Sequence, residues 1–213
     1  MQVKAIFFDL GGVIMNLNGV EEPIHRFQQL GVNDVDQLLG IYGQKGIFLD
    51  IEEGHITPDE FLAGISVMAG HDISYAEAQH AWLGFVHDVP QTNLEHLVAL
   101  RNHYKLYLLS NTNAFIQDWA RSNTFSADGH SILDFFDALY CSHELHDYKP
   151  SVSIFKKALQ GSGLRPEECL FVDDSKHNAD AAEQVGMHRL LVKSNQDWWE
   201  QLTGMLSMEG TEI

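Results

Sequence analysis

Near its start the chain reads Val3-Lys4-Ala5-Ile6-Phe7-Phe8-Asp9-Leu10-Gly11-Gly12-Val13, an apolar run that ends in an acid and two glycines. Its apolar residues do not alternate with polar ones, which is typical of a strand covered on both faces in a parallel sheet. In such a sheet, ligands bind beyond the carboxyl ends of the strands, where this acid and these glycines would lie. The stretch therefore predicts a buried first strand with a candidate site at its end.

Four further apolar runs read as buried strands, at Leu106–Leu109, Ala138–Cys141, Leu170–Val172 and Arg189–Val192. Between them lie segments with helical spacing of apolar residues, at Asn113–Asn123, Ser151–Ser162 and His177–Val185. Strands that alternate with helices imply a parallel sheet with right-handed crossovers. We therefore expect an α/β fold with a Rossmann-like parallel sheet of about five strands.

Residues 18–89, after the first strand, show helical patterns and no convincing strand. A helix is expected over Glu21–Leu30, and the stretches Thr57-Pro58-Asp59-Glu60 and Ser74-Tyr75-Ala76-Glu77 have the capping-box form that opens a helix. A segment of this length is too long for a loop in a compact domain. We expect a small α-helical cap domain at 18–89, inserted into a core domain made of residues 1–17 and 90–213.

The charge balance restricts the partners of the protein. Among 213 residues, 13 Lys and Arg stand against 30 Asp and Glu, a formal net charge of −17. Nucleic acids and anionic membranes are bound by clustered basic residues, which this sequence lacks. An anionic substrate would have to be drawn in by local cations or by a metal ion.

The chain shows no targeting signal. Its N-terminus has no signal-peptide pattern, and no apolar run reaches the 18 residues of a membrane span. The two cysteines, Cys141 and Cys169, lie in apolar runs and read as small buried residues. A cytoplasmic protein, monomeric or weakly self-associating, is the expectation.

Polar side chains follow the predicted strands: Asp9, Ser110, Asn111, Lys149, Asp173 and Asp174. A carboxylate at a strand end can bind a hard cation or attack phosphorus. Ser110 and Asn111 precede a helix whose free N–H groups favour an anion, and Lys149 offers a cation. Two adjacent acids are costly unless a cation compensates them, and Mg²⁺ suits such ligands. Together they predict a site for phosphoryl transfer.

The order of these residues resembles the four motifs of the haloacid dehalogenase-like (HAD) hydrolase superfamily. The first motif is similar to Phe7–Val13, the second to Leu108–Thr112, the third to Lys149-Pro150, and the fourth to Phe171–Ser175 with Asn178. The helical insert resembles the small cap of that superfamily. Within the insert, residues 53–61 resemble the cap of the branch related to bacterial glucose-1-phosphate phosphatase.

The resemblance implies a role for each position. Asp9 would be the nucleophile that forms an aspartyl-phosphate, and Ser110, Asn111 and Lys149 would hold the phosphoryl oxygens. Asp9, Asp174 and the backbone carbonyl of Gly11 would bind Mg²⁺. Asp173 would complete the catalytic set by supporting the metal ion or by binding it through water. The implied protein is a Mg²⁺-dependent phosphatase for small phosphorylated metabolites, such as sugar 1-phosphates.

Gly11 departs from the superfamily pattern, in which most phosphatases carry a second aspartate at that position. That aspartate acts as general acid and base, which is typically worth about 10²–10⁴-fold in rate. Without it, substrates with a better leaving group, such as anomeric or acyl phosphates, are expected to be favoured.

The sequence leaves other functions open. Gly11 leaves room for a non-catalytic protein that binds a phosphorylated ligand or a protein partner. A metal-independent 2-haloacid dehalogenase is less favoured, because the Asp173-Asp174 pair makes little sense without a cation. A zinc site over Cys141–His146 lacks a second ligand cluster at a zinc spacing.

Overall fold

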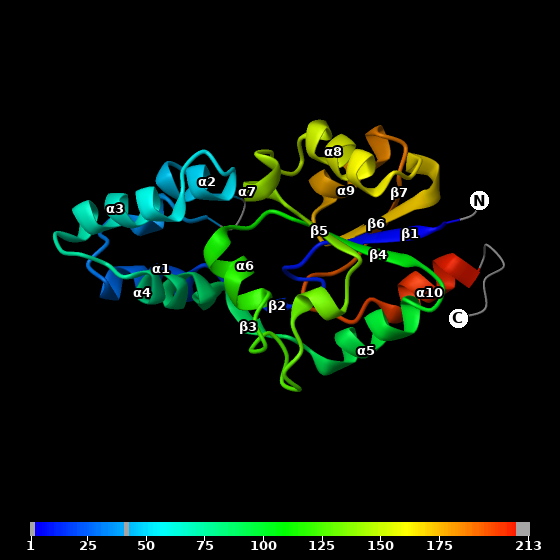
Figure 1. Ribbon diagram of the computed structural model, residues 1–213, viewed down its shortest axis with the longest axis horizontal. Coiled ribbons are helices and arrows are strands. Elements are labelled where there is room, and N and C mark those ends of the chain that lie inside the picture. The colour runs from blue at the N-terminus through cyan, green and yellow to red at the C-terminus, as the bar shows by residue number, and fades with distance from the viewer. Residues whose placement is uncertain (1–2, 41–42, 208–213) are drawn as a thin grey trace.

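The computed structural model describes residues 3–40 and 43–207 (Figure 1). Its centre is a five-stranded sheet in the order β5-β4-β1-β6-β7, with every neighbouring pair parallel. The strands are β1 (Ala5–Phe8), β4 (Lys105–Ser110), β5 (Ala138–Cys141), β6 (Cys169–Asp173) and β7 (His188–Leu191). The central β1 pairs with β4 on one side and β6 on the other, so the strand order reverses beside it. This confirms the predicted fold and places the end of β1 at the switch point where ligands bind.

Helices cover both faces of the sheet (Figure 1). One face packs against α5 (Gln91–Leu100) and α10 (Trp199–Ser207), and the other against α8 (Val152–Ser162) and α9 (Lys176–Gln184). Within β1, Ile6 and Phe8 point to the first layer while Ala5 and Phe7 point to the second, and all four are fully buried. Both faces of the strand are apolar for this reason, and the sequence shows no alternation.

A helical insert lies between β1 and β4, as expected. It contains α1 (Glu21–Gln29), α2 (Ile47–Glu52), α3 (Pro58–Ala69) and α4 (Tyr75–Trp82). Both predicted capping boxes are present, at Thr57 with Glu60 and at Ser74 with Glu77. The helices enclose an aromatic cluster in which Phe27, Phe48, Phe61 and Trp82 are fully buried and meet mainly edge to face.

The insert joins the core through a two-stranded antiparallel sheet, β2 (Asn16–Leu17) with β3 (Val86–Asp88). The expectation that residues 18–89 hold no strand was therefore wrong at β3, whose sequence Val-His-Asp carries little strand signal. We call this two-stranded sheet the neck. The side chain of Asn195 stabilises it, because it accepts the Leu17 N–H at 2.8 Å and donates to the Leu17 carbonyl at 2.9 Å.

The hydrophobic cluster of the cap continues into the core through α6 (Ala114–Ala120). Phe115 lies 5.5 Å from Phe61 and 4.6 Å from Tyr75 between ring centroids, and its carbonyl accepts the Gln79 amide at 3.0 Å. Ile116 belongs to the same cluster. A division of the chain into a core and a cap at 18–89 stays a proposal, and the two parts share one packed interior.

The predicted core helices are all present, with ends that differ by a few residues. The core also contains elements that were not predicted: the short α7 (Ser142–Leu145), the helix α10, and 3₁₀ turns at Ile132–Asp134 and Pro166–Glu168. Both cysteines are buried, and burial raises the pKa of each thiol to about 12, so neither is reactive.

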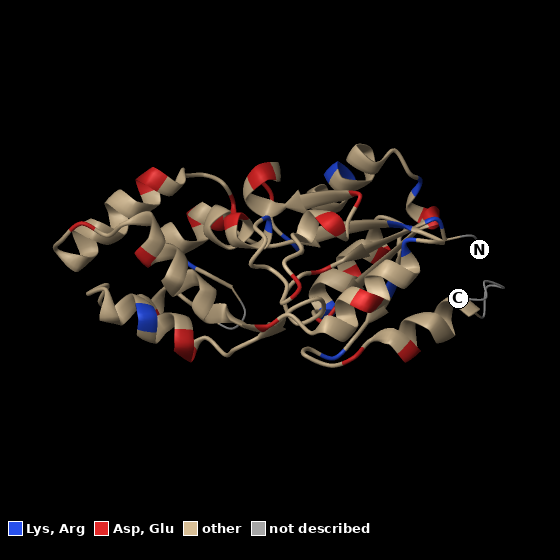
Figure 2. Cartoon of the chain, turned by 60° about the horizontal axis from the view of Figure 1, so that its bottom comes forward, with Lys and Arg blue, Asp and Glu red and all other residues tan. Residues whose placement is uncertain are grey.

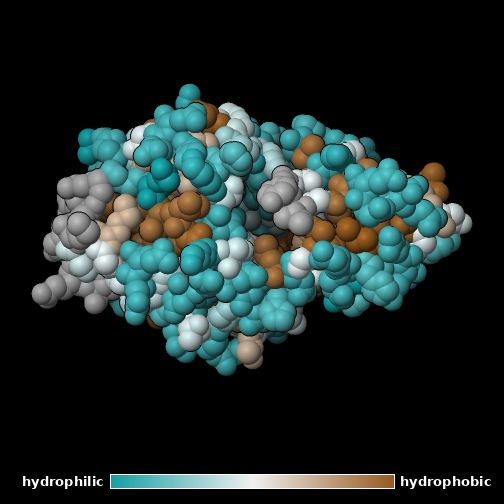
Figure 3. Space-filling view, turned by 180° about the vertical axis from the view of Figure 1, so that it is seen from behind, coloured by the Kyte–Doolittle hydropathy of each residue, from teal (hydrophilic) through white to brown (hydrophobic). Residues whose placement is uncertain are grey.

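Acidic side chains lie on helices of both the core and the insert (Figure 2). The face seen in Figure 3 is mostly hydrophilic, with apolar residues gathered in places on both parts. No helix within the described ranges is long and apolar enough to cross a lipid bilayer.

Candidate active site

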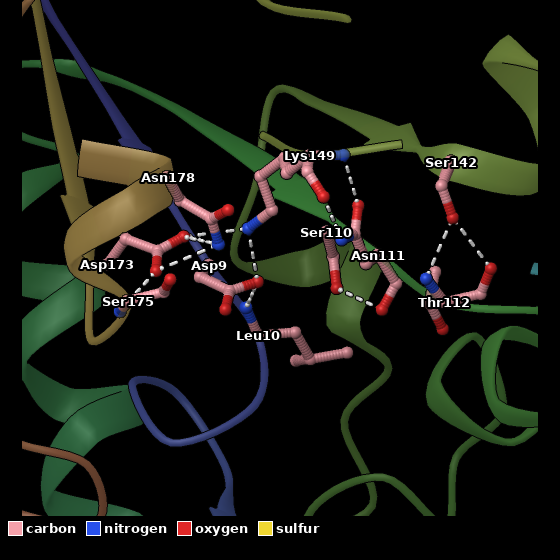
Figure 4. Close-up of polar contacts among 10 residues, drawn as sticks. All are labelled: Asp9, Leu10, Ser110, Asn111, Thr112, Ser142, Lys149, Asp173, Ser175 and Asn178. Atoms are coloured by element: carbon pink, nitrogen blue, oxygen red, sulfur yellow. Dashed lines mark hydrogen bonds and ion pairs between the residues drawn. The ribbon is translucent and has the colours of Figure 1, made fainter. Parts of the chain in front are cut away.

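The fold gathers the predicted residues at the carboxyl ends of the central strands, and Figure 4 shows all of them except Asp174. Asp9 follows β1, Ser110 ends β4, and Asp173 ends β6. Asp174 follows directly, and Lys149 comes from the loop between α7 and α8. With Asn111, which follows Ser110 directly, all six predicted residues therefore lie at one edge of the sheet.

Lys149 bridges two carboxylates. Its Nζ lies 2.8 Å from Oδ1 of Asp9 and 2.8 Å from Oδ2 of Asp173, and the side chain is only 1% exposed. The ammonium also sits 5.2 Å from the centroid of the Phe171 ring. Burial by itself lowers the pKa of Lys149, but Asp173 and Asp9 outweigh it and raise that pKa above its usual value. The lysine is thus held in its charged form.

Asp9 is the most accessible member of this ion-paired group, with a side chain that is 14% exposed. Its Oδ1 also accepts the Leu10 N–H at 2.8 Å. Burial is the main cause that raises the pKa of Asp9 to about 7, and the neighbouring Asp173 and Asp174 add to it while Lys149 opposes it. The single ammonium of Lys149 therefore does not fully compensate the negative charge around Asp9.

Asp173 and Asp174 differ in their surroundings although they are adjacent. Asp173 is fully buried and accepts from the Ser175 N–H at 2.7 Å, from the Asn178 amide at 3.1 and 3.2 Å, and from Lys149. Asp174 is half-buried, and burial raises its pKa, while a hydrogen bond from Ser194 acts in the opposite sense. Asp173 is thus saturated by protein donors, whereas Asp174 is available to a ligand.

The donor set fits a hard divalent cation. One carboxylate oxygen from each of Asp9, Asp173 and Asp174 lies within 4.8 Å of the other two, although the donors to Asp173 make Asp9 and Asp174 the better ligands. Three carboxylates face a single buried ammonium, so a further cation would relieve their repulsion. Oxygen ligands from a few carboxylates are those that Mg²⁺ prefers.

Two glycines shape the floor beside these acids. Gly12 has φ +75°, and a Cβ there would lie 2.3 Å from Oδ2 of Asp174, so only glycine lets the chain pass this carboxylate. At Gly11 a Cβ would lie 2.9 Å from Cδ1 of Leu17. The leucine of the neck strand therefore fills the space next to position 11, where the sequence resemblance led us to look for a second acid.

In the second motif, Ser110-Asn111, the side chain and the main chain of Asn111 have different partners. Ser110 is 2% exposed. The Asn111 side chain donates to the Lys149 carbonyl at 2.9 Å and accepts the Lys149 N–H at 2.7 Å. This amide is therefore occupied in positioning Lys149. The Asn111 main-chain N–H, for which residues 3–40 and 43–207 supply no acceptor, is the group left for an anion.

Several polar residues at this edge were not predicted as site residues. Asn178, on the first turn of α9, points back to Asp173, and its spacing after the paired acids is the one signal that could have identified it. Ser194, Tyr148 and Glu52 carry no such signal, because they come from a loop and from the insert and meet the site only through the tertiary fold.

Comparisons with known proteins agree with this geometry. A family model for haloacid dehalogenase-like hydrolases matches residues 3–186. The D-ribitol-5-phosphate phosphatase of Bacteroides thetaiotaomicron is 37% identical over 205 residues, which cover 96% of this chain and 99% of that protein.

Two solved structures share the whole architecture. A HAD-like family hydrolase from Porphyromonas gingivalis superposes with a TM-score of 0.90 at 37% identity, covering 97% of this chain and 98% of that one. A HAD-family enzyme from Bacteroides thetaiotaomicron, crystallised as the wild-type protein with magnesium and inorganic phosphate, gives 0.85 at 36% identity, covering 93% and 98%.

Proposed function

This chain belongs to the haloacid dehalogenase-like hydrolase family, and we propose that it is a Mg²⁺-dependent phosphatase of polyol or sugar phosphates that uses Asp9 as its nucleophile. The observation that carries the proposal is the group of Asp9, Lys149 and Asp173 joined by two 2.8 Å ion pairs, with Asp174 beside it. A nucleophilic carboxylate, a fixed cation and a set of oxygen ligands are what phosphoryl transfer requires.

In the first step, a carboxylate oxygen of Asp9 attacks phosphorus, the bond to the substrate oxygen breaks, and an aspartyl-phosphate forms. In the second step, water attacks that phosphorus and loses a proton to solvent, the bond between phosphorus and the Asp9 oxygen breaks, and inorganic phosphate leaves the restored Asp9 carboxylate. Lys149, the hydroxyl of Ser110 and the main-chain N–H of Asn111 hold the phosphoryl oxygens as their charge changes. The helix α6 begins just after these groups and favours an anion there.

Asp9, Asp174 and the Gly11 carbonyl would hold Mg²⁺, which would neutralise the charge of the phosphoryl group when bound. Asp173 orients Lys149 and is saturated by donors from Ser175 and Asn178, so it supports the site from behind. The metal complexes of the structural relative support this cofactor.

The substrate class draws on the curated relative, which is named for D-ribitol 5-phosphate. That molecule is an open-chain primary alkyl phosphate, whereas the resemblance found in residues 53–61 points to sugar 1-phosphates. The two differ in leaving group, because an alkoxide needs a proton more than an anomeric oxygen does. With Leu17 beside Gly11, the protein supplies no acid at that position, and the departing oxygen takes its proton from solvent.

Release of inorganic phosphate from a substrate panel tests the proposal. The panel contains D-ribitol 5-phosphate, sugar 1-phosphates, sugar 6-phosphates, nucleotides and acetyl phosphate, each with Mg²⁺, with EDTA, and with the Asp9→Asn variant. Release that needs both Mg²⁺ and Asp9 is the expected result. Phosphate binding without release would favour the non-catalytic reading, and chloride release from 2-haloacids in EDTA would favour a dehalogenase. A cytoplasmic location and a monomeric or weakly associating state are further expectations, and sedimentation tests the second.

A further inference from the structure

The end of helix α2 in the cap sits directly on the loop that carries Lys149. Gly54, just past α2, has φ +70°, and a Cβ there would lie 2.1 Å from the His143 carbonyl oxygen. The Gly54 carbonyl lies 3.0 Å from Nδ1 of His146. In Figure 1, α2 and α7 are neighbours at the boundary between insert and core. This contact fixes the last residue of α2, Glu52, against the core.

Glu52 is a buried carboxyl, 5% exposed, with no basic partner among the residues that the structure describes. Its Oε2 accepts the hydroxyl of Tyr148 at 3.1 Å. Tyr148 directly precedes Lys149, and the Asp9 and Glu52 carboxyls are both near enough to raise the pKa of its phenol, after the larger effect of burial. Glu52 is thus linked to Lys149 of the phosphoryl site through a single residue, Tyr148.

One buried side-chain amide, that of Asn113, faces this carboxyl from the start of α6. Asn113 is fully buried; its Oδ1 caps α6 by accepting the Ile116 N–H at 3.2 Å, and its Nδ2 faces Glu52 without a regular hydrogen bond. One turn further along α6, Gln117 is 1% exposed, and neither of its amide atoms has a partner in the described part of the chain. Burying such groups without a regular hydrogen bond is unfavourable, so the Asn113 amide beside Glu52 is a donor available to a ligand.

We propose that Glu52 is a specificity-determining residue that, with Asn113 and Tyr148, binds hydroxyl groups of the substrate chain beyond its phosphate. This rests on the proposed phosphatase function. A hydroxyl both donates and accepts, and so matches a carboxylate acceptor beside an amide donor. A substrate ammonium could donate to Glu52, but it has no lone pair with which to accept a hydrogen bond from the Asn113 amide. A second carboxylate or phosphate on the substrate would meet Glu52 with no cation nearby to compensate.

The proposal predicts a difference between substrates. We would measure kcat and KM of wild type, Glu52→Gln and Glu52→Ala with D-ribitol 5-phosphate and with acetyl phosphate, which has no hydroxyl chain. Glu53→Gln is the matched control, because Glu53 is the next residue and pairs with His55 at 3.3 Å instead. We expect Glu52→Ala to raise KM for the polyol phosphate at least about tenfold and to leave acetyl phosphate within about twofold. The control should change neither.

Other outcomes would overturn the assignment. An equal loss on both substrates would show a structural role, and a lower kcat at unchanged KM would show that Glu52 does not bind the chain. Because Glu52→Gln keeps the shape of the side chain, it guards against a folding defect in Glu52→Ala, and thermal unfolding of all variants checks this.

The two proposals fail separately. If wild-type protein releases no phosphate even from acetyl phosphate with Mg²⁺, the phosphatase function is wrong. If it hydrolyses acetyl phosphate but prefers glycerate or ethanolamine phosphates to polyol phosphates, the function stands and the role of Glu52 is wrong.

Discussion

The side-chain amide of Asn111 pairs with the backbone of Lys149 through two hydrogen bonds, one given at 2.9 Å and one received at 2.7 Å. The two residues are 38 positions apart and come from different loops. Asn111 thereby fixes the backbone from which the buried ammonium extends towards Asp9 and Asp173. We therefore propose that Asn111, which follows the proposed phosphate-binding residue Ser110, affects catalysis by positioning Lys149.

Replacing Asn111 with alanine should misplace Lys149 and lower kcat/KM about 10–100-fold, because small displacements of a catalytic group carry costs of this size. Asn111→Asp keeps the acceptor for the Lys149 N–H, so its kcat/KM should lie between those of wild type and Asn111→Ala. Asn102→Ala, at an exposed turn after α5, is the control. Steady-state phosphate release measures the effect, and wild-type activity in Asn111→Ala would contradict the positioning role.

Lys149→Met should destabilise the protein by about 3–5 kcal/mol in EDTA, because it leaves two buried carboxylates without their partner. Added Mg²⁺ should restore part of the loss, since a cation can take over the compensation. Urea unfolding followed by tryptophan fluorescence measures both values. Lys156→Met removes an exposed lysine of α8 and should change stability by less than about 0.5 kcal/mol. Equal stability of the two variants would speak against a buried charge cluster.

Gly12→Ala and Gly11→Ala form a matched pair that tests which carboxylate binds the metal ion. The new Cβ at position 12 collides with the Asp174 carboxylate and requires a φ of +75°, whereas at position 11 it meets the flexible end of Leu17. We expect Gly12→Ala to raise the Mg²⁺ concentration for half-maximal activity more than tenfold, roughly the effect of disturbing a metal ligand's setting. Gly11→Ala should change it little. Similar Mg²⁺ requirements in both variants would remove Asp174 from the ligand set.

Glu52 should make stability depend on pH. Burial, its largest cause, raises the pKa of this carboxyl from 4.5 to about 7, with Glu53 adding to the shift and Tyr148 and Asn113 opposing it. The folded state then holds the proton more tightly than the unfolded state, so stability falls as pH rises from about 4.5 to about 7 and stays low above it.

Glu52→Gln removes this titration. It should therefore stabilise the protein at pH 8 by up to about 3 kcal/mol relative to wild type, and by little near pH 5. Urea unfolding in EDTA at several pH values gives the comparison, with Glu95→Gln, which changes an exposed carboxylate on α5, as the control. A constant difference between Glu52→Gln and wild type across this range would show that Glu52 titrates normally.

The sequence was enough to predict the sheet and the residues at its edge. The strands are buried on both faces and stand out as apolar runs, and the acids follow directly where they end. The strand β3 was missed because Val86-His87-Asp88 is mostly polar and exists only by pairing with Asn16–Leu17. The proposed roles of Asn111 and Glu52 could not be predicted from the sequence either, since each depends on a contact with Tyr148 or Lys149, which are far away along the chain.

The packing of Phe115 and Ile116 inside the cluster of the cap has a consequence for how the chain unfolds. A core lacking residues 18–89 would present these two side chains to water, and an isolated insert would lose part of its interior. Neither half is self-sufficient, so excision should yield aggregation-prone fragments. The intact chain should melt in a single cooperative transition, in which the segment that carries Ser110 and Asn111 loses its order together with the cap.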